Sequence, residues 1–567
     1  MPQSEEEIRI GDFILNEDGV SYINPKDAQI IPVCSKLLLP FKTKNTECAE
    51  WGKLCVFIDP EGNEKAHHFH NSSLTGGGSR VVADLVSKGL TSSGHPRSQG
   101  LLAQYLRSVN PDSSMLSSSK QGWVRHSFVL PDRSFGSEPV VYSGTNKDHG
   151  ISSAGDWKGN VGQYCSGNSR LVLAASAAFA APLLALFEME GGGFHFRGES
   201  STGKSTALEV GASVYGSPAN YMLNWDATKN SMEEAAEAHN DCLMVIDELG
   251  IVDGGVVGDT IYMLANGHGK ARMGREKRRF RVLTLTSGEV SLAEQMANAG
   301  KVTMKGQEVR LLDVAADAGA KMGLFEELHS FIQPADLANH LKAATRKHYG
   351  QPLQDFLLLV TSRRQEVETE CRKVMDKFAA VVTPTKSNGQ VSRAIRRFGL
   401  VAAAGEIATA HGLTGWREGD AVDGAMKCFL AWMEHRRTFD TAAMAVNLVK
   451  VFILENEDRF EVVGDGSIQR QIGTGSAGLE NDERSEVPGG APNQRRVGFR
   501  KGSTFLILPH IFREVVCAGQ QHEVIAQALK ESDYLNTSAK NRLQKQERIS
   551  GKLLWGYSIK DTIREAA

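Results

Sequence analysis

The chain has 567 residues, of which 41% are hydrophobic and 23% are charged. These are ordinary globular proportions, so a wholly disordered, collagen-like or coiled-coil chain is excluded, and the length predicts two to four domains. Lys and Arg total 64 against 67 Asp and Glu, a formal net charge of −3. Any contact with nucleic acid must therefore come from local basic patches.

Neither the N-terminal sequence nor the cysteine pattern indicates that the protein is exported. The acidic start MPQSEEEIRI lacks the apolar segment of a signal peptide, and none of the eight cysteines forms a C-x-x-C pair. Cys48 and Cys55 precede three histidines, but the spacing fits no standard zinc site. Buried thiols and a polar strand are therefore preferred there, and we expect a cytoplasmic protein.

Residues 1–150 read as a β-rich N-terminal domain. Short runs with strand character are separated by turn signals such as Pro60-Glu-Gly62, and one helical pattern covers 81–89. The strand-like runs are Phe13–Leu15, Val20–Ile23, Lys53–Phe57 and Val124–Leu130.

One apolar segment imitates a membrane span. Leu171–Phe187 is almost entirely apolar, but it is short for a span and contains Pro182. Because it leads directly into a glycine-rich loop, we expect a buried helix beside a sheet and no membrane contact.

The strongest motif is GESSTGKS at 198–205, which fits G-x-x-x-x-G-K-[ST] at every fixed position. Its glycines let backbone N–H groups face phosphate oxygens, and the following helix adds its positive N-terminus. Lys204 would reach the β- and γ-phosphates of ATP, and Ser205 would ligate Mg²⁺. The candidate nucleotide-binding residues are Gly198, Glu199, Ser200, Ser201, Thr202, Gly203, Lys204, Ser205 and Thr206.

A second motif follows downstream. Leu243–Ile246 is an apolar run that is typical of a buried parallel strand, and Asp247 and Glu248 come directly after it. At the end of that strand Asp247 would hold the metal ion, and Glu248 would polarise a water for attack on the γ-phosphate. The alternative is a core strand that ends in a solvated acidic turn. With the loop upstream, the nucleotide interpretation is preferred, and the pair favours ATP hydrolysis.

Two further positions could act on the γ-phosphate. Arg281–Gly288 reads as a third strand, so Thr286 or Ser287 at its end could sense the phosphate, unless the two form an ordinary turn. Arg310 could reach the γ-phosphate of a neighbouring subunit and stabilise developing charge. The alternative for Arg310 is a salt bridge to Asp313.

A basic run lies just before the third strand. Seven of the fourteen residues in 268–281 are Lys or Arg, and Gly274 could turn the chain into a hairpin. In a ring, such a hairpin could line a central pore and grip phosphates, although a solvated charged turn would look the same. The candidate DNA-binding residues are Lys270, Arg272, Arg275, Lys277, Arg278 and Arg279.

The C-terminal part, 436–567, is predicted to be a winged-helix-like domain. It is interrupted at 469–502 by a segment rich in Gly, Pro, Asn and charges that reads as a linker. Beyond the linker, a strand at 505–509, helices at 511–517 and 522–530, and a basic hairpin that contains Trp555 fit such a module. A helix at 440–455 would join it across the linker.

The chain resembles a bacterial domain family of unknown function, found in helicase-like proteins of prophages, plasmids and mobile elements. The Cch-type cassette helicases belong to the same group. The likeness covers roughly residues 10 to 435, with a weaker echo at 505–519. The motifs that carry it are Gly122-Trp123 with Phe128–Asp132, Trp225–Asn230, Tyr262–Arg272, Thr286–Glu289, Gly306–Arg310, Arg397-Phe398 and Ala404–Glu406.

This resemblance implies an α/β AAA+ P-loop NTPase core with a helical lid over 151–435, related to minichromosome-maintenance and superfamily-three helicases. Such proteins act as rings, usually hexamers. Lys204 and Ser205 would then be Walker A, Asp247 and Glu248 Walker B, Thr286 or Ser287 sensor 1, and Arg310 the trans-acting finger. The second sensor would be Arg393, Arg396 or Arg397. Many related chains carry an N-terminal primase-like region, and nothing in this sequence looks like one. If a primase is needed, a separate polypeptide would supply it.

The leading hypothesis is an ATP-dependent DNA helicase or helicase loader that acts on single-stranded or forked DNA during replication of a mobile element. A second reading is an AAA+ ATPase that remodels protein, for instance in defence, without unwinding DNA. A third is a DNA-binding switch that binds ATP with little turnover.

Overall fold

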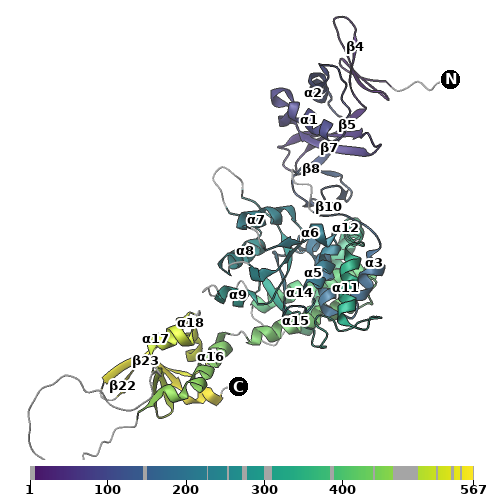
Figure 1. The fold of residues 1–567 in the computed structure, drawn as a ribbon. Coiled ribbons are helices and arrows are strands. Elements are labelled where there is room, and N and C mark those ends of the chain that lie inside the picture. Colours follow the sequence, from purple (N-terminus) through teal and green to yellow (C-terminus); the bar gives the residue numbers. More distant parts are fainter. Residues whose placement is uncertain are drawn as a thin grey trace, which may run out of the picture. The chain divides into compact units, whose positions relative to one another are not determined.

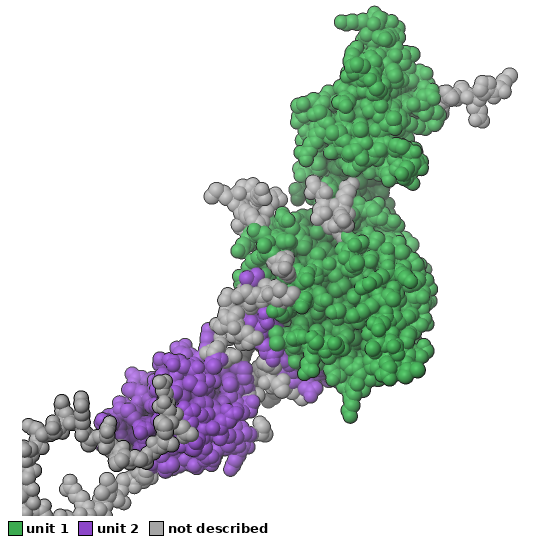
Figure 2. All heavy atoms as spheres, viewed as in Figure 1, with its two compact units in different colours: residues 1–252, 259–290, 306–429 green, residues 253–258, 291–305, 430–567 purple. Residues whose placement is uncertain are grey.

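A computed structural model describes residues 7–144, 150–225, 228–251, 254–270, 277–298, 309–382, 389–438, 441–463, 496–518, 521–537, 542–549 and 552–565. The chain divides into two compact units, drawn in green and purple in Figure 2. The first unit comprises residues 1–252, 259–290 and 306–429, and the second comprises 253–258, 291–305 and 430–567.

The first part of the chain is rich in strands, joined by two helices, of which the sequence predicted only the first. An antiparallel four-stranded sheet is followed by a five-stranded sheet in the order β12-β8-β5-β6-β7. The strands are β1 (Ile8–Ile10), β2 (Phe13–Asn16), β3 (Gly19–Ile23), β4 (Ile30–Cys34), β5 (Leu37–Lys44), β6 (Trp51–Ile58), β7 (Glu64–His70), β8 (Ser114–Ser118) and β12 (Val140–Tyr142), and the helices are α1 (Ser79–Ser87) and α2 (Ser98–Ser108).

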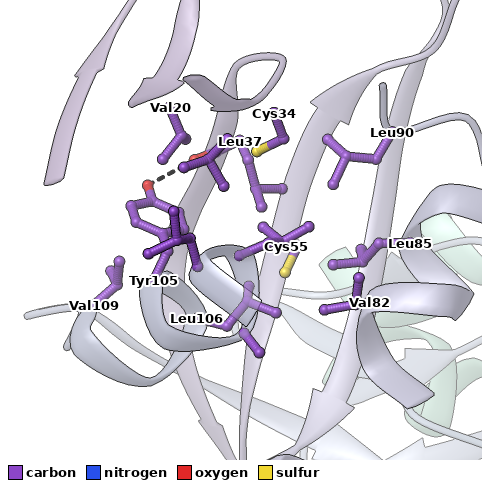
Figure 3. Close-up of a cluster of buried hydrophobic side chains, with 14 of the residues drawn as sticks. Val20, Cys34, Leu37, Cys55, Val82, Leu85, Leu90, Tyr105, Leu106 and Val109 are labelled. Carbon is purple, nitrogen blue, oxygen red and sulfur yellow. Dashed lines mark hydrogen bonds between the residues drawn. The ribbon is translucent and has the colours of Figure 1, made fainter. Parts of the chain in front are cut away.

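One hydrophobic core joins strands β2 to β7 to α1 and α2 (Figure 3). Leu85 of α1 and Leu106 of α2 are fully buried in it, and the Tyr105 hydroxyl donates to the Leu37 carbonyl at 2.9 Å. Cys55 is buried in the same core and Cys48 is exposed. Burial raises the pKa of the Cys34 thiol to about 12. Among the residues that the structure describes, no group of three or more His, Cys, Asp or Glu side chains that could hold a metal ion is found. The expectation of buried thiols holds for Cys55 and is wrong for Cys48.

A small antiparallel sheet follows, in the order β11-β10-β9. Its strands are β9 (Gly122–Val124), β10 (Ser127–Val129) and β11 (Ser134–Phe135). The prediction of one strand over Val124–Leu130 was therefore wrong, because Arg125 has a φ of 55° and turns the chain between β9 and β10. Trp123 fixes this sheet to the next layer, since its indole N–H donates to the Pro182 carbonyl at 2.7 Å.

The centre of the first unit is a parallel five-stranded sheet in the order β14-β15-β16-β13-β17. Figure 1 labels helices α5 (Lys204–Ser213), α8 (Gly254–Asn266) and α14 (Gly389–Ala410) in this part of the molecule. Its strands are β13 (Gly192–Arg197), β14 (Leu223–Asn224), β15 (Cys242–Asp247), β16 (Val282–Gly288) and β17 (Leu311–Ala315). Strand β15 is apolar up to its end and buried, as the sequence predicted. The helices of this unit also include α3 (Trp157–Asn160), α6 (Pro218–Tyr221) and α7 (Lys229–Ala238). Helix α8 is divided between the two units, and α9 (Leu292–Asn298) belongs to the second.

The apolar segment at 171–187 forms α4 (Ser169–Ala180), in which every residue is buried, and a short 3-10 turn that contains Pro182. It packs against α5 and α14 (Gly389–Ala410), which explains why it needs no polar face. Among the described residues, no helix is both long and apolar enough to traverse a bilayer. The remaining helices of this part are α11 (Pro334–Thr345), α12 (Gln351–Ser362), α13 (Arg364–Val382) and α15 (Asp420–Thr438).

The C-terminal part has its own core, around Phe505, Phe512 and Tyr557. The expected order of strand, two helices and hairpin is present, and residues 498–501 form a strand instead of belonging to the linker. The rest of the predicted linker, up to residue 495, lies outside the described residues. The elements are α16 (Thr441–Glu455), β18 (Phe460–Val462), β19 (Gly498–Lys501), β20 (Thr504–Ile507), α17 (Pro509–Ile511), the π-helical turn η6 (Phe512–Val516), α18 (His522–Glu531), β21 (Leu535–Asn536), β22 (Lys545–Ile549) and β23 (Lys552–Lys560).

Candidate nucleotide site

The glycine-rich loop joins the end of β13 to the start of α5, the strand–loop–helix context that the motif requires. Gly203 has a φ of 94°, and a Cβ there would lie 1.9 Å from a methyl group of Leu324, so both backbone and space demand glycine. Ser201 also has a positive φ, of 67°. Strain of this kind is typical of ligand-binding loops.

Lys204 lies over its own loop. Its ammonium group donates to the carbonyls of Gly198 and Glu199, each at 2.7 Å. Burial lowers the pKa of Lys204, and the carboxylates of Glu289 and Asp247 oppose that shift, so the cation lies in a field of nearby negative charge. A phosphate oxygen could replace these two carbonyls as acceptor, since the side chain is only half-buried.

The acidic pair lies at the same edge of the sheet as the loop. Strand β16 lies between β13 and β15, and Ser287 at its end donates a hydrogen bond to Asp247. The Glu248 N–H donates to the same Asp247 carboxylate at 3.0 Å. Glu248 itself is exposed and has a φ of 68°, a strained conformation for a residue other than glycine.

The two sensor candidates differ sharply in their surroundings. Thr286 is fully buried, and its hydroxyl accepts a hydrogen bond from the Trp225 indole N–H at 2.8 Å. Ser287 is the next residue, so its side chain lies on the opposite face of the strand, where it contacts Asp247. The geometry therefore favours Ser287 over Thr286 as the residue that communicates with the acidic pair.

Sequence reasoning did not single out Glu289 as a site residue, although it ends one of the motifs of the resemblance. The Ser200 hydroxyl donates to the Glu289 carboxylate at 2.6 Å, which ties the loop to the end of β16. The chain after β17 also lies against the loop, since the Leu324 N–H donates to the Thr202 carbonyl at 2.9 Å. A sequence pattern could not reveal these contacts, because they depend on strand order.

Arg310 lies at the opposite edge of the sheet. It precedes β17, whose Leu311 is opposite Gly193 of β13. Arg310 is therefore level with Gly192, six residues of extended strand before Gly198, which is about 20 Å at the usual rise per residue. Its guanidinium stacks on Tyr262, 4.5 Å from the ring centroid, and donates to Asn266.

The alternative salt bridge between Arg310 and Asp313 is not what the structure contains. Asp313 instead pairs with Arg197, with 3.1 Å between Nε and Oδ1. Arg197 is the last residue of β13 and Asp313 lies in the middle of the adjacent β17, so neighbouring strands bring them together.

The second-sensor prediction is wrong for Arg397. Arg397 is 6% exposed, and its guanidinium donates to the carbonyls of Gly191 and Val309, both at 2.8 Å, at the amino ends of β13 and β17. Burial lowers the pKa of Arg397 to about 10. Arg397 therefore has a structural role, at the end of β13 opposite to the one that leads to Lys204. Arg393 and Arg396 lie earlier in α14 with exposed side chains, and their role stays a prediction.

The basic run forms the base of a hairpin. His268 and Arg279 pair as an antiparallel bridge, and the Phe280 N–H donates to the Gly267 carbonyl at 3.0 Å. Arg278 forms ion pairs with Glu234 and Glu237 of α7, which makes it the least available of the predicted DNA contacts. Lys270, Lys277 and Arg279 are exposed, whereas Arg272 and Arg275 lie outside the described residues.

The donor set at the loop edge fits a magnesium nucleotide. Ser205 occupies the second position of α5, and Asp247 ends β15 at the same edge, so a hydroxyl and a carboxylate oxygen are offered to a hard cation. The free N–H groups of the first turn of α5 and the Lys204 ammonium would take the phosphates. Residues 198–206 therefore could hold ATP, with Ser205 and Asp247 as ligands of Mg²⁺.

Comparison with known proteins gives a match to one family over part of the chain and a solved structure of similar fold. Residues 13–279 match the family described as "Domain of unknown function (DUF927)". A solved structure described as "SCCmec type IV Cch - active helicase" matches with a TM-score of 0.68 and 17% identity, over 99% of this chain and 100% of that one.

Two other solved structures, of NtrX from Brucella abortus with ADP and with ATP, have TM-scores of only 0.19 and 0.18. Both are 13% identical; the matches cover 43% and 41% of this chain, and 48% and 47% of the NtrX chains. They carry no argument about the fold. No curated protein matches the sequence.

The Cch likeness extends over the whole chain, so it includes the C-terminal part that lies beyond the family match. At 17% identity it shows a shared mixed α/β fold. Residues 13–279 of the chain are therefore similar to the DUF927 family, and the chain shares the fold of the SCCmec Cch structure.

Proposed function

We propose that this protein is an ATP-dependent DNA helicase or helicase loader, with an AAA+ core that hydrolyses ATP on Mg²⁺. The observation that carries the proposal is the strand order, in which β16 lies between β13 and β15. This order brings Lys204, Ser287 and the Asp247–Glu248 pair to one edge, as the sensor hypothesis requires. The description of the SCCmec Cch protein as an active helicase supports the choice of reaction.

In this proposal the residues divide the work of hydrolysis. Lys204 and the start of α5 bind and orient the phosphates, Ser205 and Asp247 hold Mg²⁺, and Glu248 accepts a proton from the attacking water. The bound metal ion would neutralise charge that develops on the phosphates. Ser287, hydrogen-bonded to Asp247, would relay the state of the γ-phosphate to β16.

The position of Arg310 supports a ring of subunits in this proposal. About 20 Å of strand separates it from its own loop, so a role at the γ-phosphate would have to be at the nucleotide of a neighbour. The exposed Lys270, Lys277 and Arg279 at the base of the basic hairpin would contact single-stranded or forked DNA. A homo-hexamer, with a separate primase, is the assembly that we expect. The domains would span 1–150, 151–435 and 436–567.

ATP hydrolysis and strand separation test this proposal together. Wild type should hydrolyse ATP faster when single-stranded DNA is added, and it should displace a strand from a forked duplex. Glu248→Gln should bind ATP normally and hydrolyse it at least tenfold more slowly, about 1.4 kcal/mol in barrier. Hydrolysis without DNA stimulation or strand displacement would favour a protein-remodelling ATPase. Equal turnover by both proteins would reject the Glu248 assignment.

A further inference from the structure

The hairpin of β22 and β23 in the C-terminal part has two faces of different chemistry. Gln546 is opposite Trp555, and Arg548 is opposite Leu553, so these four side chains share one face. Ile549 and Leu554 belong to the other face and pack against Phe499 and Leu506. Further along β23, Tyr557 and Ile559 continue the first face into the core of the C-terminal part, whereas at Leu553 and Trp555 this face is exposed. We call this exposed part of the first face the outer wing face, and the face of Ile549 and Leu554 the inner face.

The outer wing face combines an exposed aromatic ring with positive charge. Trp555 is 39% exposed and Leu553 is 55% exposed, so this face presents two large apolar side chains to solvent. The guanidinium of Arg542 lies over the Trp555 ring, 5.8 Å from its centroid, and the exposed Arg548 adds a second positive charge. None of the described residues named on this face is acidic.

The acidic residue of β22 is directed elsewhere. Glu547 lies on the inner face, where it pairs with Lys545 at 2.9 Å and accepts a hydrogen bond from the Ser558 hydroxyl. Its charge is therefore compensated within the hairpin, and it does not offset the two arginines of the outer wing face.

Helix α18 has the opposite character. Its buried side holds Ile525 and Leu529, and its exposed side presents Glu523, Gln527 and Glu531. Gln527 donates to Glu531 at 2.9 Å. Two exposed carboxylates and no fully exposed cation make this helix a poor partner for a phosphate backbone, whose binding depends on Lys and Arg.

We propose that the outer wing face, Arg542, Gln546, Arg548, Leu553 and Trp555, is a second nucleic-acid contact, and that it binds single-stranded DNA while α18 stays off the strand. The proposal rests on the proposed function in taking DNA as the partner. Unpaired bases offer flat π-faces that stack on Trp555, and phosphates pair with the two arginines. This contact lies outside the hairpin at 268–281 and does not need ATP.

Binding of labelled oligonucleotides to the full-length protein, measured by fluorescence anisotropy without nucleotide, tests the proposal. Trp555→Ala should weaken binding of single-stranded DNA about five- to a hundredfold, the range for loss of one stacked base. Trp555→Phe should restore most of the affinity, because a ring is retained. Arg548→Ala should reduce the slope of log K against log salt by about 0.7 on single strands.

Two variants in the same part of the chain serve as controls. Arg513→Ala removes an equally exposed positive charge from η6, and Gln527→Ala removes a side chain from the exposed side of α18. Both should bind as wild type does. Thermal unfolding of each variant checks that the C-terminal part remains folded, and Arg548→Ala keeps the test valid if Trp555→Ala does not fold.

Three results would overturn the proposal. These are unchanged affinity in both Trp555→Ala and Arg548→Ala, an equal loss in the Arg513→Ala or Gln527→Ala control, and a loss confined to duplex DNA of the same length. A chain that fails to hydrolyse ATP would instead reject the proposed function and leave these binding results standing.

Discussion

The two edges of the central parallel sheet each hold a cation against backbone carbonyls, but with different consequences. At the carboxyl edge Lys204 donates to Gly198 and Glu199 from a half-buried loop with strained backbone. At the amino edge Arg397 donates to Gly191 and Val309 from a site that is 6% exposed. The two cations make similar contacts but differ in exposure. Half-buried Lys204 could exchange its carbonyl partners for a ligand, whereas buried Arg397 holds the fold together.

The largest effect is expected at the carboxyl edge. Lys204→Ala removes the one ammonium group that lies over the loop, so affinity for ATP should fall and turnover should drop at least a hundredfold, about 2.7 kcal/mol in barrier. Binding of a fluorescent ATP analogue and release of phosphate would measure both. The unfolding midpoint should stay close to that of wild type, and a large loss of stability instead would make Lys204 a structural cation like Arg397.

Arg310 tests whether the amino edge serves a neighbouring subunit. Arg310→Ala should lower turnover at least a hundredfold, since a trans-acting arginine contributes 10³ to 10⁵ in related phosphoryl transfers. Its own loop should still bind ATP. A mixture with Lys204→Ala subunits should regain activity where an intact loop meets an intact arginine. If mixing restores nothing, the stacking on Tyr262 and the bonds to Asn266 are the whole role of Arg310.

Loss of the Arg397 side chain should lower the stability of the protein more than it lowers ATP turnover. Arg397→Ala leaves buried carbonyls without a donor and should cost about 3 kcal/mol of the free energy of unfolding, measured with urea. The matched control is Arg396→Ala, which removes an exposed neighbour and should change stability by no more than about 0.5 kcal/mol. A second-sensor role for Arg397 would give the reverse result, with unfolding unchanged and turnover reduced.

The adjacent residues Thr286 and Ser287 make a finer comparison within one strand. Ser287→Ala removes the donor to Asp247 and should slow turnover about tenfold, which corresponds to about 1.4 kcal/mol. Thr286→Val leaves the Trp225 indole N–H without its acceptor and should cost about 1 to 2 kcal/mol of stability instead. Phosphate release and urea unfolding of both variants separate the two roles, and the opposite pattern would exchange the assignments.

The smallest effect concerns the hairpin base. Lys277→Ala together with Arg279→Ala removes two exposed charges and should reduce the salt slope of single-strand binding by about 0.7 for each lost phosphate contact. Arg278→Ala is a useful control, because its charge already pairs with Glu234 and Glu237. An unchanged slope in the double variant would make this run a solvated turn.

Much of the fold could be predicted from local pattern. The buried strand before Asp247, the fully buried helix α4 and the helices of the C-terminal part follow from apolar runs and their period. Predictions were wrong where one residue decided the path of the chain. Arg125 adopts a positive φ that divides one expected strand into two, and propensity for β structure gives no sign of that.

The sequence by itself determined the loop at 198–205 and the acidic pair at 247–248, because phosphate binding needs specific residues at fixed spacing. Only the tertiary structure decided which strands are neighbours, and that order unites Ser287 with Asp247, Ser200 with Glu289 and Arg197 with Asp313. It also decided that Arg397 is buried while Arg396 is exposed. The physical reason is that spacing along the chain fixes local backbone geometry, whereas the partners and burial of a charge depend on residues that are distant in sequence.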